Sequence, residues 1–504
     1  MRINSFEPIN RRERRKVIAL TGASGYIGSH LLKRLEEDAD IIAISRNTDA
    51  SKNCSQVEWR SCDFFSQEQA LEALRGADIA FYLIHSMLPS AKLTQGSFED
   101  MDAILAAHFA RAAAQNGIRQ IIYLSGMIPA GLPENDLSRH LRSRLEVERI
   151  LGSFGVPVTT IRAGLIVGPE GSSYPILSKL VRRLPIMVMP SWTRTKTHPV
   201  ALTDVLDALT ASIGRAEVMG RFIDVGGPDI MSYGQLLRET GELMGLKRIM
   251  IPFPFPTIKL SRLWISLITG APKAISYPLV ESLAHPMVAS KENEVDGISK
   301  GSISYREAAK QALEQEMKKQ KAQAHSSQSP LAQEQADSSP NSEPAISKKL
   351  KALKSDVRSV QRFTLPPGKN ADWAGKHYVN WLSNAFKPFI YAEHAENEII
   401  RIRVRPLRKP VLELSYAREL SSAHRSVYRI TGGCFALTAE APDGRLEFTQ
   451  LPESQDCLAA IHDYMPALPW LLYKYGQAKI HLIVMYAYGR RLKRLASNRP
   501  MKSK

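Results

Sequence analysis

The sequence predicts an α/β protein: a doubly wound parallel sheet, then a linker, then a smaller α+β domain. Three observations carry this prediction. Short apolar runs alternate with helical patterns up to about residue 230, large apolar residues become rare after residue 317, and apolar–polar alternation begins near residue 398. Strands alternating with helices are typical of parallel sheets covered on both faces. A segment without large apolar side chains cannot offset the entropy cost of folding.

The strands of the first part are expected where short β-branched runs are bounded by polar residues or glycine. Their continuous apolar character fits strands that are buried on both faces. The seven runs are Val17–Leu20, Ile41–Ile44, Val57–Arg60, Ile79–Leu83, Ile121–Leu124, Val158–Ile161 and Phe222–Val225. Longer patterns with helical spacing lie between them, notably at Ser97–Asn116 and Leu137–Phe154.

Composition divides the chain into six segments. They are an N-terminal tail (1–14), the parallel-sheet domain (15–230), a helical extension (231–317), a disordered linker (318–358), an α+β domain of unknown function (359–495) and a basic tail (496–504).

Period-two alternation predicts the strands of the last folded segment. It is clear at Glu398–Val404 and Val411–Tyr416, and Ser426–Thr431 and Arg445–Thr449 are two further strand candidates. We expect a helix over Ala459–Tyr488. Its aromatic residues are Trp470, Tyr473, Tyr475, Tyr486 and Tyr488. They indicate a ligand cavity, a membrane-facing strip or a helix packed on a sheet.

The charge and cysteine content narrow the setting of the protein. The chain of 504 residues carries a formal net charge of +17, which suits contact with anionic surfaces, although solvated basic segments give the same value. Its four cysteines lack metal-ligand spacing and fit a reducing compartment. No secretory signal or membrane-spanning run is evident, so we expect a cytoplasmic protein whose basic tail can contact an anionic membrane. No motif for binding nucleic acid is present.

The first strand leads directly into the glycine-rich run Thr21–Gly28, before a helix expected at His30–Glu37. Gly22 allows the tight turn, Gly25 lets the backbone approach a pyrophosphate, and Gly28 permits close packing of helix on strand. The pyrophosphate would lie on free N–H groups at the helix N-terminus. We therefore predict a dinucleotide-binding loop made of Gly22, Ser24, Gly25, Tyr26, Ile27 and Gly28.

The end of the second strand indicates which dinucleotide is bound. An acidic residue there would bind the adenosine ribose and favour NAD(H), but the chain has Ser45 and Arg46. Arg46 can pair with a 2′-phosphate and Ser45 can donate a hydrogen bond to it, so we predict that NADP(H) is preferred over NAD(H). Asp63, after the third strand, either meets the adenine amino group or caps the following turn.

These motifs resemble the short-chain dehydrogenase/reductase superfamily, in particular its atypical, NmrA-like NAD(P)-binding Rossmann proteins. The resemblance covers about residues 15–290 and does not reach the C-terminal domain. It implies a Rossmann sheet that binds a nicotinamide dinucleotide, with the helical extension completing the substrate side. Further matching motifs are Phe81–Met87, Ile122–Gly126, Arg162–Pro169, His198–Val200 with Asp204, and Val225–Pro228.

One departure from the family pattern concerns catalysis. Conventional members carry a Tyr-x-x-x-Lys pair, whereas His140 falls at the tyrosine position here and Arg144 at the lysine position. The i, i+4 spacing places both on one helix face. Arg144 can hold a phosphate or ribose but cannot act as an acid or base. His140 can donate a proton, although nearby arginines favour its neutral form. We name both as candidate catalytic residues, with a solvent-facing or structural role as the alternative.

Two further residues are assigned to the cofactor because the resemblance places them near it. Ser125 ends the fifth strand, and His85 follows the fourth, close to where a nicotinamide ribose would lie. Arg144 completes this set. Four apolar residues are candidates for a substrate pocket or for plain core: Met127, Ile128, Tyr174 and Trp192.

The sequence leaves two functions open. The first is an NADPH-dependent oxidoreductase that acts on a small apolar carbonyl or quinone-like substrate. The second is a non-catalytic protein that senses NADP(H) or uses it structurally, which the missing tyrosine and lysine favour. Epimerase-like chemistry is a weaker third possibility because it would require the tyrosine.

Overall fold

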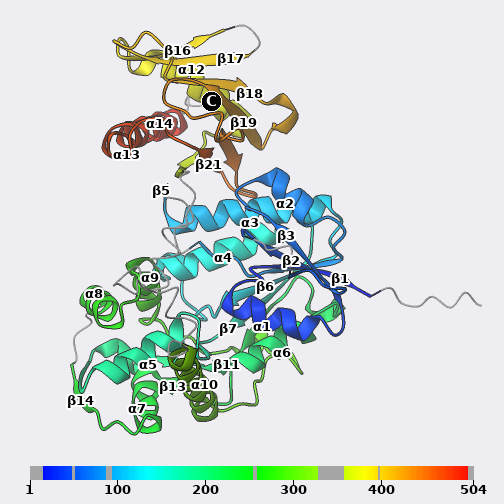
Figure 1. The fold of residues 1–504 in the computed structure, drawn as a ribbon, viewed down its shortest axis with the longest axis vertical. Coiled ribbons are helices and arrows are strands. Elements are labelled where there is room, and N and C mark those ends of the chain that lie inside the picture. The colour runs from blue at the N-terminus through cyan, green and yellow to red at the C-terminus, as the bar shows by residue number, and fades with distance from the viewer. Residues whose placement is uncertain are drawn as a thin grey trace, which may run out of the picture.

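The computed structural model describes residues 15–47, 52–86, 93–253, 258–326, 357–395 and 398–497. Its N-terminal part contains a seven-stranded sheet in the order β12-β7-β6-β4-β1-β2-β3, and all six neighbouring pairs are parallel (Figure 1). The strands are β1 (Val17–Thr21), β2 (Asp40–Ser45), β3 (Val57–Ser61), β4 (Ile79–Tyr82), β6 (Gln120–Gly126), β7 (Val158–Ala163) and β12 (Phe222–Val225). The predicted doubly wound sheet and its seven strands are confirmed.

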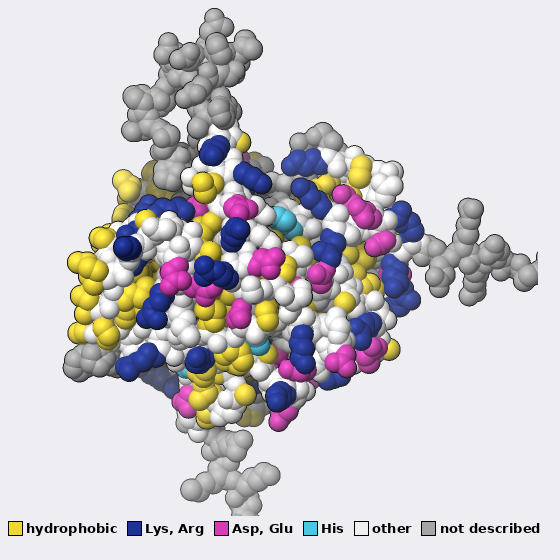
Figure 2. Space-filling view, turned by 90° about the horizontal axis from the view of Figure 1, so that it is seen from below, with side chains coloured by type: hydrophobic (Ala, Val, Ile, Leu, Met, Phe, Trp, Pro, Cys, Tyr) yellow, Lys and Arg dark blue, Asp and Glu magenta, His cyan; other side chains and the backbone are white. Residues whose placement is uncertain are grey.

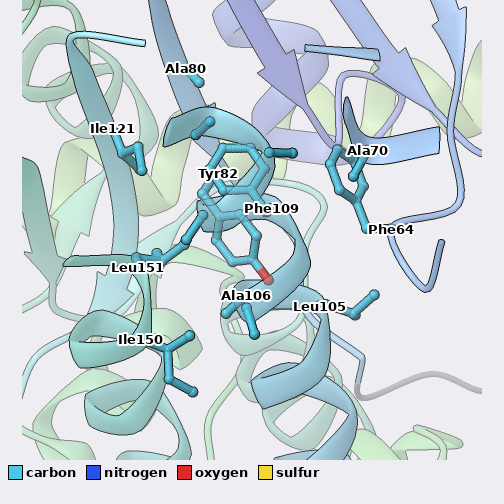
Figure 3. Packing of buried hydrophobic residues seen from close by; sticks show 14 of the residues in the cluster. Phe64, Ala70, Ala80, Tyr82, Leu105, Ala106, Phe109, Ile121, Ile150 and Leu151 are labelled. Atoms are coloured by element: carbon cyan, nitrogen blue, oxygen red, sulfur yellow. The ribbon is translucent and has the colours of Figure 1, made fainter. Parts of the chain in front are cut away.

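Helices cover both faces of this sheet, as the continuous apolar character of the strands requires. One face packs against α1 (Tyr26–Leu35) and α6 (Leu202–Ala211). The other packs against α2 (Gln67–Ala73), α3 (Phe98–Gln115) and α4 (Arg139–Gly152). Figure 3 shows this second core, where the rings of Tyr82 and Phe109 meet edge to face with centroids 4.9 Å apart. The expected helix at His30–Glu37 begins four residues earlier, at Tyr26, because Gly25 is its N-cap.

The helical extension packs beside the carboxyl ends of the strands and forms a third core. Its helices are α7 (Tyr233–Leu243), α8 (Ile258–Thr269), α9 (Lys273–Ser282) and α10 (Tyr305–Ser326), and α5 (Ser173–Arg183) of the preceding segment packs in the same core. Short strands join in pairs, namely β8 (Ile166–Val167) with β11 (Val200–Ala201), β9 (Ile186–Met189) with β14 (Ile249–Pro252), and β10 (Lys196–Thr197) with β13 (Met231–Ser232). Ala308, Ala309 and Ala312 anchor the first turns of α10 in this core, and the helix continues to Ser326, past residue 318 where the linker was expected to begin.

The C-terminal part forms an eight-stranded sheet in the order β16-β17-β18-β19-β20-β21-β15-β5. The strands are β15 (Val357–Thr364), β16 (Ile390–His394), β17 (Ile399–Val404), β18 (Leu412–Tyr416), β19 (Arg425–Gly432), β20 (Arg445–Gln450) and β21 (Asp456–Tyr464). The eighth, β5 (Leu93–Gln95), comes from the N-terminal part and pairs parallel with β15. One face carries α12 (Ala371–Ala385), α13 (Trp470–Leu472) and α14 (Ala478–Ser497). The four strands that alternation predicted are all present.

The helix expected over Ala459–Tyr488 is wrong in its first part. Residues 459–464 belong to β21, which pairs with β15 and β20. Leu458 and Ala460 face the N-terminal core, whereas Cys457 and Ala459 face α12 and α14. Burial on both faces therefore overrides the helical preference of alanine.

The aromatic residues of the C-terminal region divide between core and surface. Tyr473 and Tyr488 are buried, and the Tyr488 ring packs edge to face on Tyr378 with centroids 5.1 Å apart. Tyr475 and Tyr486 are exposed. For Tyr473 and Tyr488, the interpretation that holds is therefore a helix packed on a sheet.

The two parts of the chain share one core. Val360 and Leu458 of the C-terminal sheet lie in the same apolar cluster as α3 and α4. Polar contacts reinforce the joint: the Arg362 guanidinium pairs with Asp100 and Glu146 of the N-terminal part.

Several expectations fall outside the described residues: the N-terminal tail, linker residues 327–356 and the basic tail from residue 498 onward. Within the described ranges, no helix is long and apolar enough to cross a membrane.

Candidate functional site

The glycine loop has the geometry that close approach of a phosphate requires. Gly22 adopts a φ of +69°, and its carbonyl accepts a hydrogen bond from the Gly25 N–H at 2.8 Å. A Cβ on Gly28 would lie 2.2 Å from the Gly22 carbonyl oxygen, so only glycine fits there. The first N–H groups of α1 have no intrahelical acceptor, because helix hydrogen bonding begins when the Ser29 N–H donates to Gly25. These N–H groups and the helix dipole favour an anion at this end.

An open hollow of about 1000 Å³ extends from this loop to the ends of β2 and β3. Ser24, Ser45 and Arg46 line it, and the hydroxyls of the two serines are 2.9 Å apart. Arg46 is exposed at its rim. The sequence-predicted residues of the adenosine end therefore lie together.

Asp63 lines the same hollow and makes two polar contacts there. Its carboxylate accepts a hydrogen bond from the Phe65 N–H at 3.2 Å, which is the turn-capping role that the sequence left open. It also pairs with Arg358, the second residue of β15 in the C-terminal sheet. Although burial raises the pKa of Asp63, the Arg358 guanidinium outweighs this and holds the pKa below the usual value.

Arg358 is one site residue that sequence reasoning missed. It is only 4% exposed at its side chain, and its guanidinium lies over the Phe65 ring, 4.4 Å from the ring centroid. Arg358 lines the hollow together with Arg46. The only sequence signal was a basic residue inside a strand otherwise rich in small and apolar residues, 295 positions away from Asp63. Nothing local could have linked the two.

A second hollow continues from the loop along the carboxyl ends of β6 and β7. Ser125, His140 and Arg144 line it, together with Tyr26 and Ile27 of the loop. His140 and Arg144 thus lie on one face of α4, as their spacing predicted. Three buried polar atoms of residues in this wall lack a hydrogen-bond partner among the described residues: the Tyr26 hydroxyl, the Ser125 hydroxyl and the His140 Nδ1. Such orphaned atoms are suited to a bound ligand.

The charge at this end is set by Arg144. It is buried, and one guanidinium nitrogen donates to the Tyr123 hydroxyl at 3.4 Å. Burial opposes its protonation, but Tyr123 and Asp102 outweigh this and raise the pKa of Arg144 above the usual value. Asp102 of α3 is also buried and accepts hydrogen bonds from the Ser86 N–H and hydroxyl, both at 2.7 Å. Asp102 was not foreseen, because one aspartate in a helix gives no sign of its tertiary partners.

His140 is neutral at physiological pH. Burial, together with the charge of Arg144, lowers its pKa to about 3. The ring therefore serves as a hydrogen-bonding group and not as an imidazolium acid. His85 lines both hollows from the opposite wall, at the end of β4.

A third cavity of about 940 Å³, partly open to solvent, adjoins the second hollow and is strongly apolar. Met127 and Trp192 line it as expected, whereas Tyr174 lies in the core of the helical extension and does not line it, nor does Ile128. The helical extension and α5 both contribute to its wall, through Leu237 and Val280 on one hand and Leu177 and Leu180 on the other. The cavity and the second hollow share the following residues: Gly126, His140, Ala163, Gly164, Ser173 and Leu279.

The three hollows thus form one path, from the arginines at the adenosine end, past the glycine loop, to an apolar cavity behind His140. The fold and this path define a dinucleotide-binding protein of the Rossmann class.

Comparison with known proteins supports the same kind of site. Residues 22–182 match the family model described as NAD(P)H-binding. The match covers the glycine loop and the ends of the strands that line the hollows, so the N-terminal part contains an NAD(P)H-binding domain.

Two curated relatives and one solved structure are among the proteins that resemble this chain. The auxiliary protein GraX of Staphylococcus aureus is 37% identical over 146 residues, which span 28% of this chain and 42% of GraX. A ceramide reductase of Caulobacter vibrioides is 26% identical over 311 residues, covering 56% of this chain and 93% of that protein. An NADPH-dependent quinone oxidoreductase from Escherichia coli, solved with NADPH, has a TM-score of 0.46 and 18% identity, covering 58% of this chain and 98% of that one.

Proposed function

We propose that the protein is an NADPH-dependent reductase of an apolar carbonyl or quinone-like substrate. The observation that carries this is the position of His140, a residue that lines both the cofactor hollow and the apolar cavity. A polar hydrogen-bonding group at the mouth of an otherwise apolar cavity is suited to orienting one carbonyl oxygen of an apolar molecule.

Bound NADPH would supply a hydride to the carbonyl carbon. The neutral His140 ring holds the carbonyl oxygen by an N–H hydrogen bond, and the fixed positive charge of Arg144 stabilises the alkoxide that develops as the C=O π bond breaks. The proton that completes the alcohol comes from water, because a histidine with a pKa of about 3 is not protonated near neutral pH. This division of labour replaces the tyrosine and lysine of conventional members.

The preference for NADPH rests on the charge at the adenosine end. Arg46 and Arg358 both line that hollow, and the nearby carboxylate of Asp63 is already paired with Arg358. An excess of guanidinium groups suits a 2′-phosphate, which arginine binds through charge-assisted hydrogen bonds.

The apolar cavity and one relative favour a long, lipid-like substrate. Leu177, Leu180, Leu237 and Val280 are among the residues of its wall. The name of the Caulobacter relative, ceramide reductase, is consistent with a substrate of this kind for the present chain.

A non-catalytic role in sensing NADP(H) is the alternative. The absence of a tyrosine acid at position 140 favours it, and so does the C-terminal sheet, which reaches the cofactor hollow through Arg358 and can report its occupancy.

Turnover decides between the two. We expect NADPH oxidation with a long-chain ketone or a quinone, which His140→Phe lowers at least tenfold in kcat while the NADPH dissociation constant changes little. Arg182→Ala, at an exposed position on α5, is the matched control and should leave kcat unchanged. NADPH binding with no oxidation above background for either substrate class would favour the sensing role.

A further inference from the structure

Helix α8 exposes its leucines and buries its small polar residues. Leu260, Leu263 and Leu267 lie on one face and are 59%, 49% and 81% exposed. The opposite face is buried and contains Ile265 beside the small polar residues Ser261, Ser266 and Thr269. Apolar residues therefore lie on both faces of α8, and each exposed leucine forgoes the free energy of burial.

A two-stranded sheet nearby presents the same pattern. In the parallel pair β9–β14, Ile249 lies opposite Ile186, and Ile251 lies opposite Val188. All four are exposed, whereas the intervening Met187 is buried. Figure 2 shows hydrophobic side chains gathered along the left edge of the molecule, the side on which Figure 1 places α8 and β14.

We call these seven side chains the α8 face. It consists of Leu260, Leu263 and Leu267 of α8, Ile186 and Val188 of β9, and Ile249 and Ile251 of β14. Exposed apolar side chains gathered on one side of a molecule mark an interaction site.

The chain around the α8 face is basic throughout. Residues 171–203 contain five lysines and arginines and no acidic residue, and so do residues 243–280. Some of these cations are paired, since Arg182 contacts Glu316 and Arg262 contacts Glu281. Lys247 and Lys259 are exposed and carry no ion pair within the described part of the chain.

We propose that the α8 face docks on the surface of an anionic lipid membrane. Apolar side chains set among lysines and arginines match the two demands of such a surface, which takes up apolar groups at the acyl boundary and attracts cations. A second copy of the chain is a poorer occupant, because a symmetric contact would bring two basic surfaces together.

The apolar cavity lies directly behind this face. Ile265 of α8 and Leu279 and Val280 of α9 form part of its wall. A docked α8 would therefore separate the bilayer from the cavity by one helix. The docking of α8 on a membrane does not depend on the proposed function. The entry of a membrane-dissolved substrate into the apolar cavity does rest on it.

Vesicle flotation with the full chain tests the proposal without any turnover. We expect the protein to float with vesicles of phosphatidylcholine and phosphatidylglycerol, and far less with phosphatidylcholine alone. Replacing the three α8 leucines by glutamine should lower the partition coefficient about tenfold or more. Lys247→Glu with Lys259→Glu should lower it about tenfold as well, and these surface changes test the face if the leucine variant fails to fold.

Two variants serve as comparisons. Leu407→Gln with Phe222→Gln alters exposed apolar residues remote from the α8 face and should float like the unchanged protein. Ile480→Gln with Ile483→Gln alters the exposed apolar residues of α14, next to the basic tail. NADPH titration and thermal unfolding of each variant establish that it is folded.

Three results would overturn the proposal. The first is that the unchanged protein stays at the bottom of the gradient with anionic vesicles. The second is that the α8-face variants float like the unchanged protein while the α14 variant does not, which would assign binding to the C-terminal helix. The third is that light scattering shows a dimer that the leucine variant converts to a monomer, which would assign the face to self-association. Loss of flotation with NADPH oxidation intact, or the reverse, separates this inference from the proposed reductase.

Discussion

At the scale of single residues, the cofactor site is governed by a few buried or half-buried charges with identifiable partners. Arg358 neutralises Asp63 at one end, and Asp102 with Tyr123 supports Arg144 at the other. The ring of His140, between them, remains uncharged. Each of these side chains has a consequence that a single substitution can measure.

Arg46→Asp tests the preference for the 2′-phosphate. Loss of a charge-assisted contact and gain of a like charge should raise the NADPH dissociation constant at least about tenfold, by fluorescence titration. NADH binding should change little, and Arg34→Ala, an arginine paired with Asp207 elsewhere, is the control. An equal loss for NADH would show that Arg46 does not read the phosphate.

His140 predicts a pH dependence of stability. Its folded-state pKa of about 3 lies below the unfolded value of 6.5, so the unfolded state gains protons first as the pH falls. The stabilisation is therefore complete above pH 6.5 and is lost progressively toward pH 3. By pH 5 the loss is about 2 kcal/mol. Urea unfolding of His140→Phe should show a shallower decline by that amount, whereas His424→Phe at an exposed position should not. Parallel curves for all three proteins would contradict the assignment.

At the scale of elements, the sequence specified the N-terminal strands well because each is apolar on both faces and ends at a turn. It specified β21 poorly, because Ala459 and Ala460 have no local strand signal and acquire their conformation from two neighbouring strands and two cores. It also placed the linker too early, since α10 is held by alanines whose burial depends on a distant core.

The same reasoning explains the candidate site. The glycine loop, Arg46 and the His140–Arg144 pair were accessible because they depend on local spacing. Arg358 and Asp102 were not, because their roles arise only where distant elements meet.

The turn into α1 yields a prediction at this scale. In Gly28→Ala the new methyl group would lie 2.2 Å from the Gly22 carbonyl oxygen, so the loop must shift. We expect a loss of stability of about 1–3 kcal/mol and weaker binding of both NADPH and NADH. Gly152→Ala is the matched control, because its methyl group would meet only Val158 at an ordinary 3.8 Å. Unchanged binding in Gly28→Ala would mean that the dinucleotide does not lie on this loop.

At the scale of the whole molecule, buried charges join the two parts of the chain. Glu447 of β20 is fully buried and accepts hydrogen bonds from Arg425 at 2.9 Å and from His108 of α3 at 3.1 Å. Arg425 also pairs with Glu68 of α2. These charges hold the pKa of Glu447 well below its usual value, although burial alone would raise it.

Glu447→Gln should therefore destabilise the protein as a whole. Removing one partner of a buried charge network leaves the others uncompensated, at a cost of about 3 kcal/mol. Chemical unfolding followed by tryptophan fluorescence measures it, and Glu440→Gln at an exposed position is the control. If Glu447→Gln lost no more stability than Glu440→Gln, the network would not hold the two parts of the chain together.

The reach of Arg358 from the C-terminal sheet into the nucleotide hollow has one more consequence. A ligand that touches this guanidinium binds both halves of the molecule at once, so its binding energy and the docking of the two halves become linked quantities. Whatever strengthens one must strengthen the other by the same factor. Because NADPH and NADP⁺ have the same adenosine end, the total occupancy of the site, and not the ratio of the two forms, would set how firmly the second half is held.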